Sequence, residues 1–203
     1  MSLIELSEAQ ELLNPYVDYL YSWPTEAWDK YHRSTPRELL VEYSARTRAS
    51  AVHDLIVANA RADEMSDLMV FNYRKMKGVL IAGRLVTRFK KLSEDGKSCS
   101  IATKQVRDFR QQRSLPGFPS THNLELGYVL NDSQTEIVEV LVTQPSGKGV
   151  AWTLSINSSG MQGEISNIFT APQAPTSGAD GAVIKIKDSV HIATVLPFKK
   201  GES

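Results

Sequence analysis

The sequence predicts an α+β fold, in which an N-terminal helical layer packs on a mostly antiparallel curved sheet and a C-terminal β arm follows. The hydrophobic pattern indicates this class, because its period changes from helical to strand-like near residue 67. Turn-forming residues in short loops separate the later segments, which favours antiparallel hairpins. The chain has 203 residues, 41% of them hydrophobic, and can bury one domain core.

The predicted domain covers residues 1–168, with a helical part over 1–66 and a β-rich part over 67–168. A stretch rich in Pro, Gly, Ser and Thr comes next and is typical of a linker. Residues 169–203 are therefore expected to form a linker and a two-stranded β arm. The arm either completes the sheet or reaches a partner chain, and the sequence leaves both open.

Prolines and capping residues set the expected helix boundaries. Pro24 is expected to separate short helices at 16–22 and 25–31. Thr35-Pro36 then opens a helix of about 26 residues that ends near Ala62, and the sequence allows an interruption in it. One stripe of that helix is apolar and mostly small: Val41, Ala45, Ala49, Val52, Ile56 and Ala60. We expect this stripe to bury against the sheet or against a second copy of the chain.

Segments with a period of about two residues are predicted as strands. They cover residues 68–73, 78–92, 98–102, 124–130, 136–143 and 151–156. One helix, at about 103–112, is expected to interrupt them.

Charge is distributed unevenly, although the formal net charge is zero. Residues 1–71 carry a net charge of −6, residues 72–113 a net charge of +9, and residues 114–203 a net charge of −3. A basic segment of this strength indicates an anionic partner. The competing interpretation is that it pairs with the acidic helical part, within the chain or across a homodimer, and the two can coexist.

The candidate nucleic-acid-binding surface combines a basic strand, a hairpin and a basic helix. Its residues are Arg84, Arg88, Lys90, Lys91, Lys104, Arg107, Arg110 and Arg113. Side chains at even positions of a strand share one face, so Arg84, Arg88 and Lys90 are expected to project together. We expect these cations to bind phosphates and Phe89 and Phe109 to add base stacking.

A candidate catalytic pair lies on the long helix. Arg48 and His53 have an Arg-x4-His spacing that resembles the short motif of HEPN-type ribonucleases. This resemblance implies that Arg48 stabilises phosphate charge while His53 acts as acid or base. On a regular helix the two are about 140° apart, whereas Arg46 and His53 are within about 20° with Ser50 between them. Arg46 and Ser50 are therefore supporting candidates, and a core role for His53 is the competing interpretation.

The sequence predicts no metal site and no cofactor. The pair His53-Asp54 occurs in HD-type metal phosphohydrolases, but the other histidines lie in unrelated predicted elements without ligand spacing. A single cysteine, Cys99, is compatible with a reducing cytoplasm. The longest strongly apolar run, at 78–83, is far shorter than the roughly 20 residues of a membrane span.

We therefore expect a cytoplasmic protein that binds nucleic acid or another anionic polymer. Its enzymatic form would be a metal-independent endoribonuclease, and the sequence leaves open whether it is an enzyme. The alternative function is a non-enzymatic interaction protein or regulatory subunit of a two-protein bacterial module, whose basic segment meets an acidic protein surface.

Overall fold

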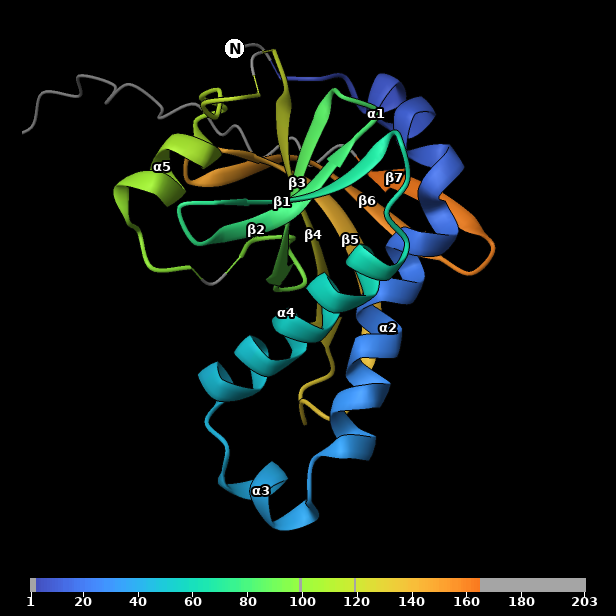
Figure 1. Cartoon of the computed structure of the whole chain (residues 1–203), viewed down its shortest axis with the longest axis vertical. Helices are drawn as coiled ribbons and strands as arrows, with labels where there is room; N and C mark the ends of the chain where they lie inside the picture. Colours follow the sequence, from blue (N-terminus) through green and yellow to red (C-terminus); the bar gives the residue numbers. More distant parts are fainter. Residues whose placement is uncertain (1–2, 99, 119, 165–203) are drawn as a thin grey trace, which may run out of the picture. The chain divides into compact units, whose positions relative to one another are not determined.

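The computed structural model describes residues 3–98, 100–118 and 120–164, and in this part the N-terminal helices cover one face of a single sheet (Figure 1). The helices are α1 (Leu6–Leu13), the 3-10 helix η1 (Asn14–Tyr16), α2 (Val17–Ser34), α3 (Arg37–Glu42), α4 (Ala45–Ala62) and α5 (Lys104–Arg110). The strands are β1 (Leu68–Tyr73), β2 (Met76–Ile81), β3 (Leu85–Lys91), β4 (His122–Leu130), β5 (Ile137–Ser146), β6 (Gly149–Asn157) and β7 (Gly160–Glu164). The predicted α+β class is confirmed.

The strands follow one another across the sheet in chain order, from β1 to β7. All neighbouring pairs are antiparallel except β3 and β4, which run parallel with Leu85 opposite His122 and Lys91 opposite Tyr128. A parallel pair needs a long crossover instead of a tight turn. Residues 92–121, which include α5, supply that crossover.

The main core lies between the sheet and the helices α1, α2 and α4. Trp23 of α2 packs edge-on against Phe89 of β3, with ring centroids 6.0 Å apart. Trp28 of α2 contacts Tyr128 of β4 with a centroid separation of 5.9 Å. The aromatic residues of the first helices therefore form the core of the helical layer.

The helical part differs from the prediction at Pro24, and the interruption that the sequence allows in the long helix is present. Helix α2 continues directly from η1 and runs without interruption through Pro24. The prediction of a break between two short helices at Pro24 is therefore wrong. The stability gained by burying the neighbouring Trp23 and Ala27 in the core outweighs the cost of the backbone hydrogen bond that Pro24 cannot donate. The long helix is interrupted, because Tyr43 is extended and Ser44 caps α4 by accepting a hydrogen bond from the Thr47 amide.

The apolar stripe of the long helix is buried only along its second half. Val52, Ile56 and Ala60 are in the core, whereas Val41 is 87% exposed and Ala45 is exposed. Figure 1 shows α3 and the first turns of α4 extending away from β1 and β2.

Two strand predictions are wrong. The segment 78–92 forms two strands, because Ala82 and Gly83 both have positive φ (49° and 64°) and turn the chain between β2 and β3. Among the described residues of the segment 98–102, Ser98 forms an isolated bridge with Leu92, and none belongs to a strand. Strand β7 was not predicted; it pairs with β6 through residues 160–164.

The second face of the sheet is covered by the crossover. Phe109 of α5 and Leu115 pack on Val86 of β3, and Leu92 packs on Val129 and Leu141. Both faces of β3 and β4 are thus buried, which is usual for parallel strands and unusual for an open antiparallel sheet.

A buried ion pair lies beneath this crossover. Arg88 and Glu125 are direct neighbours across the parallel pair β3–β4, and their side chains are 4% and 1% exposed. Glu125 Oε1 accepts hydrogen bonds from Arg88 Nε, at 2.9 Å, and from Arg88 Nη2. The guanidinium carbon lies 4.3 Å from the centroid of the Phe109 ring. This stacking joins the ion pair to α5.

Two buried amides fix the end of the crossover. Gln112 donates to the carbonyls of Asn123 and Pro145 at 2.9 and 2.8 Å and accepts from the Asn123 amide at 2.9 Å. Asn123 Nδ2 donates to the carbonyls of Phe109 and Arg113, each at 3.0 Å. The backbone after α5 is therefore bound to the start of β4.

Some predictions lie outside the described residues: the linker and β arm at 169–203, and Cys99. Within the described residues, no helix combines the length and the apolar character that a membrane crossing requires.

We predict that replacing Arg88 by Met lowers the free energy of unfolding by about 3–5 kcal/mol, because the Glu125 carboxylate is left buried without its partner. The double variant Arg88→Met/Glu125→Leu should recover most of this loss, since it removes both buried charges. Urea denaturation of the wild type, Arg88→Met, Glu125→Leu and the double variant measures the coupling. Additive losses in the double variant would contradict this account.

Candidate functional site

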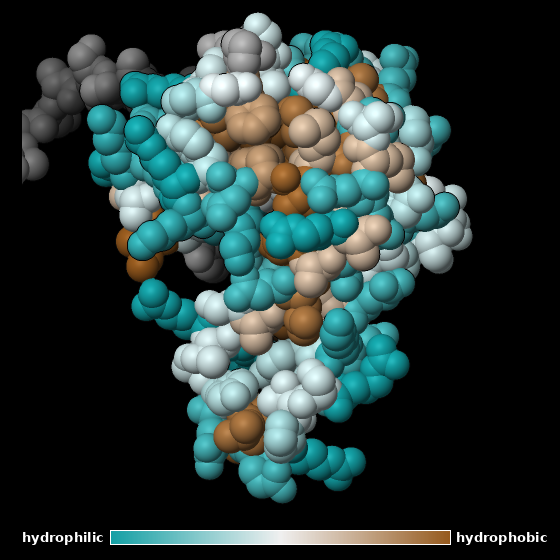
Figure 2. Space-filling model, viewed as in Figure 1, coloured by the Kyte–Doolittle hydropathy of each residue, from teal (hydrophilic) through white to brown (hydrophobic). Residues whose placement is uncertain are grey.

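A cavity of about 1030 Å³ lies beside the C-terminal end of β3. Its walls come from α4, the end of β3, the loop that follows β3, and the turn between β4 and β5. Figure 2 shows hydrophilic side chains gathered across the middle of one face of the molecule, above α4. The cavity walls include five cationic side chains, Arg46, Lys75, Lys77, Lys90 and Lys91, and three carboxylates, Asp54, Glu94 and Asp132.

Helix α4 brings three of the sequence candidates to this cavity: Arg46, Ser50 and His53. Helical geometry places residues three, four and seven apart on one side, and α4 is regular over this stretch. Arg46 and Ser50 are exposed, and His53 is half-buried near Phe89 with a ring-centroid separation of 6.3 Å. The expected grouping of these three side chains is therefore present.

Arg48 is not among the described residues that line the cavity. Burial raises the pKa of Tyr31 in α2 and of Tyr128 in β4, and the charge of Arg48 opposes this rise on both phenols. Arg48 and His53 therefore differ in their surroundings. This is the consequence of their separation of about 140° around the helix.

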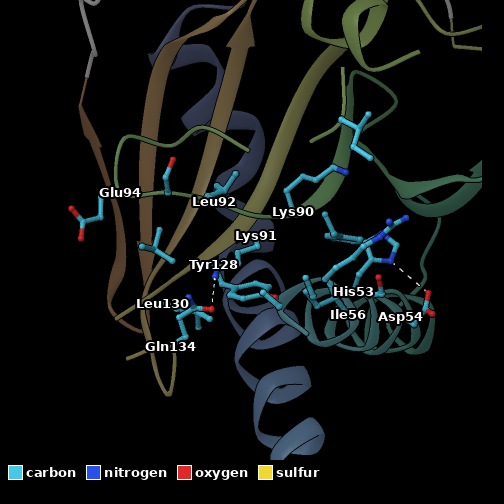
Figure 3. A pocket seen from close by; sticks show the side chains of 18 of the residues that line it. His53, Asp54, Ile56, Lys90, Lys91, Leu92, Glu94, Tyr128, Leu130 and Gln134 are labelled. Carbon is cyan, nitrogen blue, oxygen red and sulfur yellow. Dashed lines mark hydrogen bonds and ion pairs between the residues drawn. The ribbon is translucent and has the colours of Figure 1, made fainter. Parts of the chain in front are cut away.

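Strand β3 contributes Lys90 and Lys91, its last two residues. The register with β2 ends at Arg88, so both lysines lie beyond the last described β2–β3 pair. Figure 3 shows Lys91 directed to Gln134 and Lys90 directed to the side on which His53 and Asp54 lie. The Lys91 ammonium donates a hydrogen bond of 3.2 Å to Gln134 Oε1.

The hairpin between β1 and β2 brings cations that sequence analysis did not assign to a site: Arg74, Lys75 and Lys77. Arg74 and Lys75 form the turn and have φ values of 48° and 69°. Such values favour Gly, Asn and Asp, and an Arg-Lys pair gives no turn signal in the sequence. Lys77 binds Asp54 of α4 at 2.9 Å, which joins the hairpin to the helix.

The pKa of His53 lies below its ordinary value of 6.5. Burial is the largest cause, and the charges of Lys90 and Lys77 act in the same direction. The Asp54 carboxylate, 3.5 Å from His53 Nδ1, opposes them. The imidazole is therefore neutral at pH 7 and can accept a proton.

The eight residues of the predicted basic surface do not form one surface. Arg84 precedes β3 and pairs with Glu8 of α1, whereas Lys90 is at the other end of β3, about 20 Å away at the usual rise per residue. Arg88 is buried with Glu125, so the expectation that it shares an exposed surface with Arg84 is wrong, whereas Arg88 and Lys90 both line a smaller cavity.

The cations of α5 divide into exposed and bound groups. Lys104 and Arg107 are exposed. Arg110 donates to the carbonyls of Gly147 and Gly149 at 3.0 and 3.4 Å and so holds the β5–β6 turn. Arg113 pairs with Asp108 at 2.9 Å.

Base stacking on Phe89 and Phe109 is excluded by their burial, since they are 1% and 0% exposed. Phe89 packs against Trp23 and Phe109 packs beneath Arg88. Strand and helix amphipathicity directs both rings to the core.

Among the described residues, no group of three His, Asp or Glu side chains converges as a metal site would require. Comparison of the chain with protein-family models, with curated protein sequences and with solved structures found no significant match. The function is therefore inferred from the geometry of the cavity.

We predict that His53 makes the protein less stable in acid. Because its folded-state pKa is lowered, the unfolded chain takes up the proton first as the pH falls below about 6.5. The stability of the wild type relative to His53→Asn should be fully present above that pH and decline below it. Urea denaturation between about pH 5 and 8 and an NMR titration of His53 measure this. A relative stability that rises on acidification would contradict the prediction.

Proposed function

We propose that this protein binds a phosphate-bearing ligand, specifically a nucleic-acid strand, in the cavity beside β3. The observation that carries the proposal is the convergence of cations from three separate elements on one hollow: Arg46 from α4, Lys75 from the β1–β2 hairpin, and Lys90 from β3. Bringing like charges together costs electrostatic free energy, which a bound polyanion offsets.

A second cavity next to the first supports a nucleic-acid strand over a compact anion as the ligand. A smaller cavity of about 180 Å³ shares His53, Lys75, Lys77, Phe89 and Lys90 with the first, and Gln105 and Val106 at the start of α5 border it. Lys104 and Arg107 are exposed on that same helix. A chain of phosphates entering at Arg46 can therefore continue toward α5 over cationic side chains.

Recognition by this site would depend on charge more than on base identity. Phe89 and Phe109 are buried and unable to stack with bases. Contacts to phosphates position a strand and carry no sequence information directly. Binding should therefore be strongly salt-dependent and weakly sequence-dependent.

We predict that Arg46→Glu/Lys75→Glu weakens binding of a fluorescent single-stranded oligonucleotide by about tenfold or more at low salt. The salt slope should fall by about 1 for each phosphate that the variant no longer neutralises. Fluorescence anisotropy across a salt series measures both quantities. The matched control is Lys30→Glu, an exposed charge reversal on α2 outside the described cavities, which should change little. Adding Lys104→Glu/Arg107→Glu tests whether the bound oligonucleotide extends to α5, because a further loss of affinity is then expected.

The same measurement separates this proposal from the alternative function. Binding without salt dependence, or equal effects of the cavity and control variants, would contradict a phosphate site. Co-purification of an acidic protein that survives nuclease treatment, together with no oligonucleotide binding, would support a protein-interaction or regulatory role.

A second candidate function is a metal-independent ribonuclease, and the observation that favours it is the neutral His53 beside Arg46 and Lys90. An imidazole with a lowered pKa can take the proton of an RNA 2′-hydroxyl, whose oxygen then attacks the adjacent phosphorus and expels the 5′-oxygen. Arg46 and Lys90 are placed to stabilise the charge that develops on the phosphate. Arg48, outside the described lining, would not take part directly.

We predict that RNA is cleaved in the presence of EDTA and that His53→Asn lowers the cleavage rate by about 100-fold or more. The binding experiment is run in parallel, so that loss of affinity and loss of chemistry are separated. An oligonucleotide with 2′-deoxyribose at every position is the matched substrate control and should stay intact. Equal cleavage by the wild type and His53→Asn would remove His53 from the mechanism.

A further inference from the structure

Lys90 differs from the other half-buried lysines that the structure describes. Lys77 pairs with Asp54 at 2.9 Å, Lys97 pairs with Asp95 at 2.5 Å, and Lys91 is hydrogen-bonded to Gln134. Lys90 has no hydrogen bond or ion pair to any described residue, although it is equally half-buried. Its amine is free to contact a ligand in the cavity.

The surroundings of Lys90 are predominantly cationic. Arg88 lies two residues earlier in β3 and faces the same side of the sheet, and its partner Glu125 is already engaged by two hydrogen bonds. Lys75 and Lys77 on the hairpin and His53 on α4 line the same cavity. These charges shift Lys90 toward the neutral amine relative to an exposed lysine.

Burial and the Arg88 charge lower the pKa of Lys90, and the Glu125 carboxylate opposes them in part. A lysine that is desolvated and next to another cation has a larger fraction of its amine unprotonated at neutral pH. This is the form that attacks a carbonyl carbon. Three observations therefore support a nucleophilic amine at Lys90. The side chain lines a cavity, it has no hydrogen bond or ion pair to a described residue, and its neighbours are cations.

We propose that Lys90 forms an imine with an aldehyde carried by a phosphate-bearing ligand in the cavity. This inference rests on the proposed function, since the cations that surround Lys90 are what would hold the phosphate. The Lys90 Nζ lone pair adds to the aldehyde carbon, the carbonyl oxygen takes up protons and leaves as water, and a C=N bond replaces C=O. The step is reversible and needs no oxidant or reductant.

The shared chemistry is an aldehyde close to a phosphate, and it has two sources. One is the ring-opened sugar of an abasic position in a nucleic-acid strand, which has a phosphate on either side. The other is a small phosphorylated aldehyde. The first source fits the two neighbouring cavities, whose lining residues extend from α4 to the start of α5.

Borohydride trapping tests the inference, because it reduces the imine to a stable secondary amine. The probes are a single-stranded oligonucleotide with one abasic position, pyridoxal 5′-phosphate, and pyridoxal without the phosphate. Peptide mass spectrometry of the full chain locates the modified lysine. We expect an adduct on Lys90 with both phosphate-bearing probes and at least about tenfold less with pyridoxal.

Variants and pH distinguish Lys90 from ordinary surface lysines. Lys90→Arg should lose the adduct, while Lys30→Arg, which changes an exposed lysine on α2, should keep it. Formation of the Lys90 adduct should reach half its maximum rate at a lower pH than modification of a lysine in a short unstructured peptide. The peptide map of the wild type gives the answer directly even if Lys90→Arg does not fold.

The outcomes also separate this inference from the proposed function. Binding of an intact oligonucleotide together with no trapping on Lys90 would overturn the imine and leave the binding site standing. Trapping with pyridoxal 5′-phosphate but not with the abasic oligonucleotide would assign a small-molecule ligand. It would contradict the proposal that the cavity binds a nucleic-acid strand. Labelling spread equally over exposed lysines would overturn the special reactivity of Lys90.

Discussion

The parallel pairing of β3 with β4 is the constraint on which the rest of this structure depends. It requires the chain to leave the end of β3, cross the sheet and return at the opposite end, and residues 92–121 do so over the second face. The buried Arg88–Glu125 pair lies across that junction, and Phe109 of α5 packs on the guanidinium. A buried ion pair gives little net stability against an apolar pair, but it penalises any register that separates the charges.

The cavity is a consequence of the same junction. Because β2 pairs with β3 only as far as Arg88, the last residues of β3 have no described partner on that side. The crossover leaves here, and the first turns of α4 extend away from β1 and β2 (Figure 1). The space between these elements is lined by Arg46 of α4 and by Lys90 and Lys91 of β3. On a flat sheet, the two lysines would be ordinary surface cations.

The basic segment serves several purposes, and this reconciles the two interpretations of its charge. Arg84 pairs with Glu8 and Lys77 pairs with Asp54, so part of the charge is neutralised by the acidic helical part. These pairs are half-exposed and contribute at most about 1 kcal/mol each. Arg110 holds a turn. The cations that remain without acidic partners are the ones that define a candidate binding site, and they are fewer than the charge count indicates.

Local periodicity predicts the α+β class, the strands near β1, β4 and β6, and the helix α5. Helical geometry likewise predicts that the side chains of Arg46, Ser50 and His53 lie together. The pattern also identified the segment that supplies Lys90. Three other features required the folded chain: Pro24 lies within a continuous helix, Arg88 is buried, and Lys75 joins the cavity. Burial, strand pairing and the meeting of distant elements depend on contacts across the chain, and a local pattern carries no information on which element will cover a given side chain.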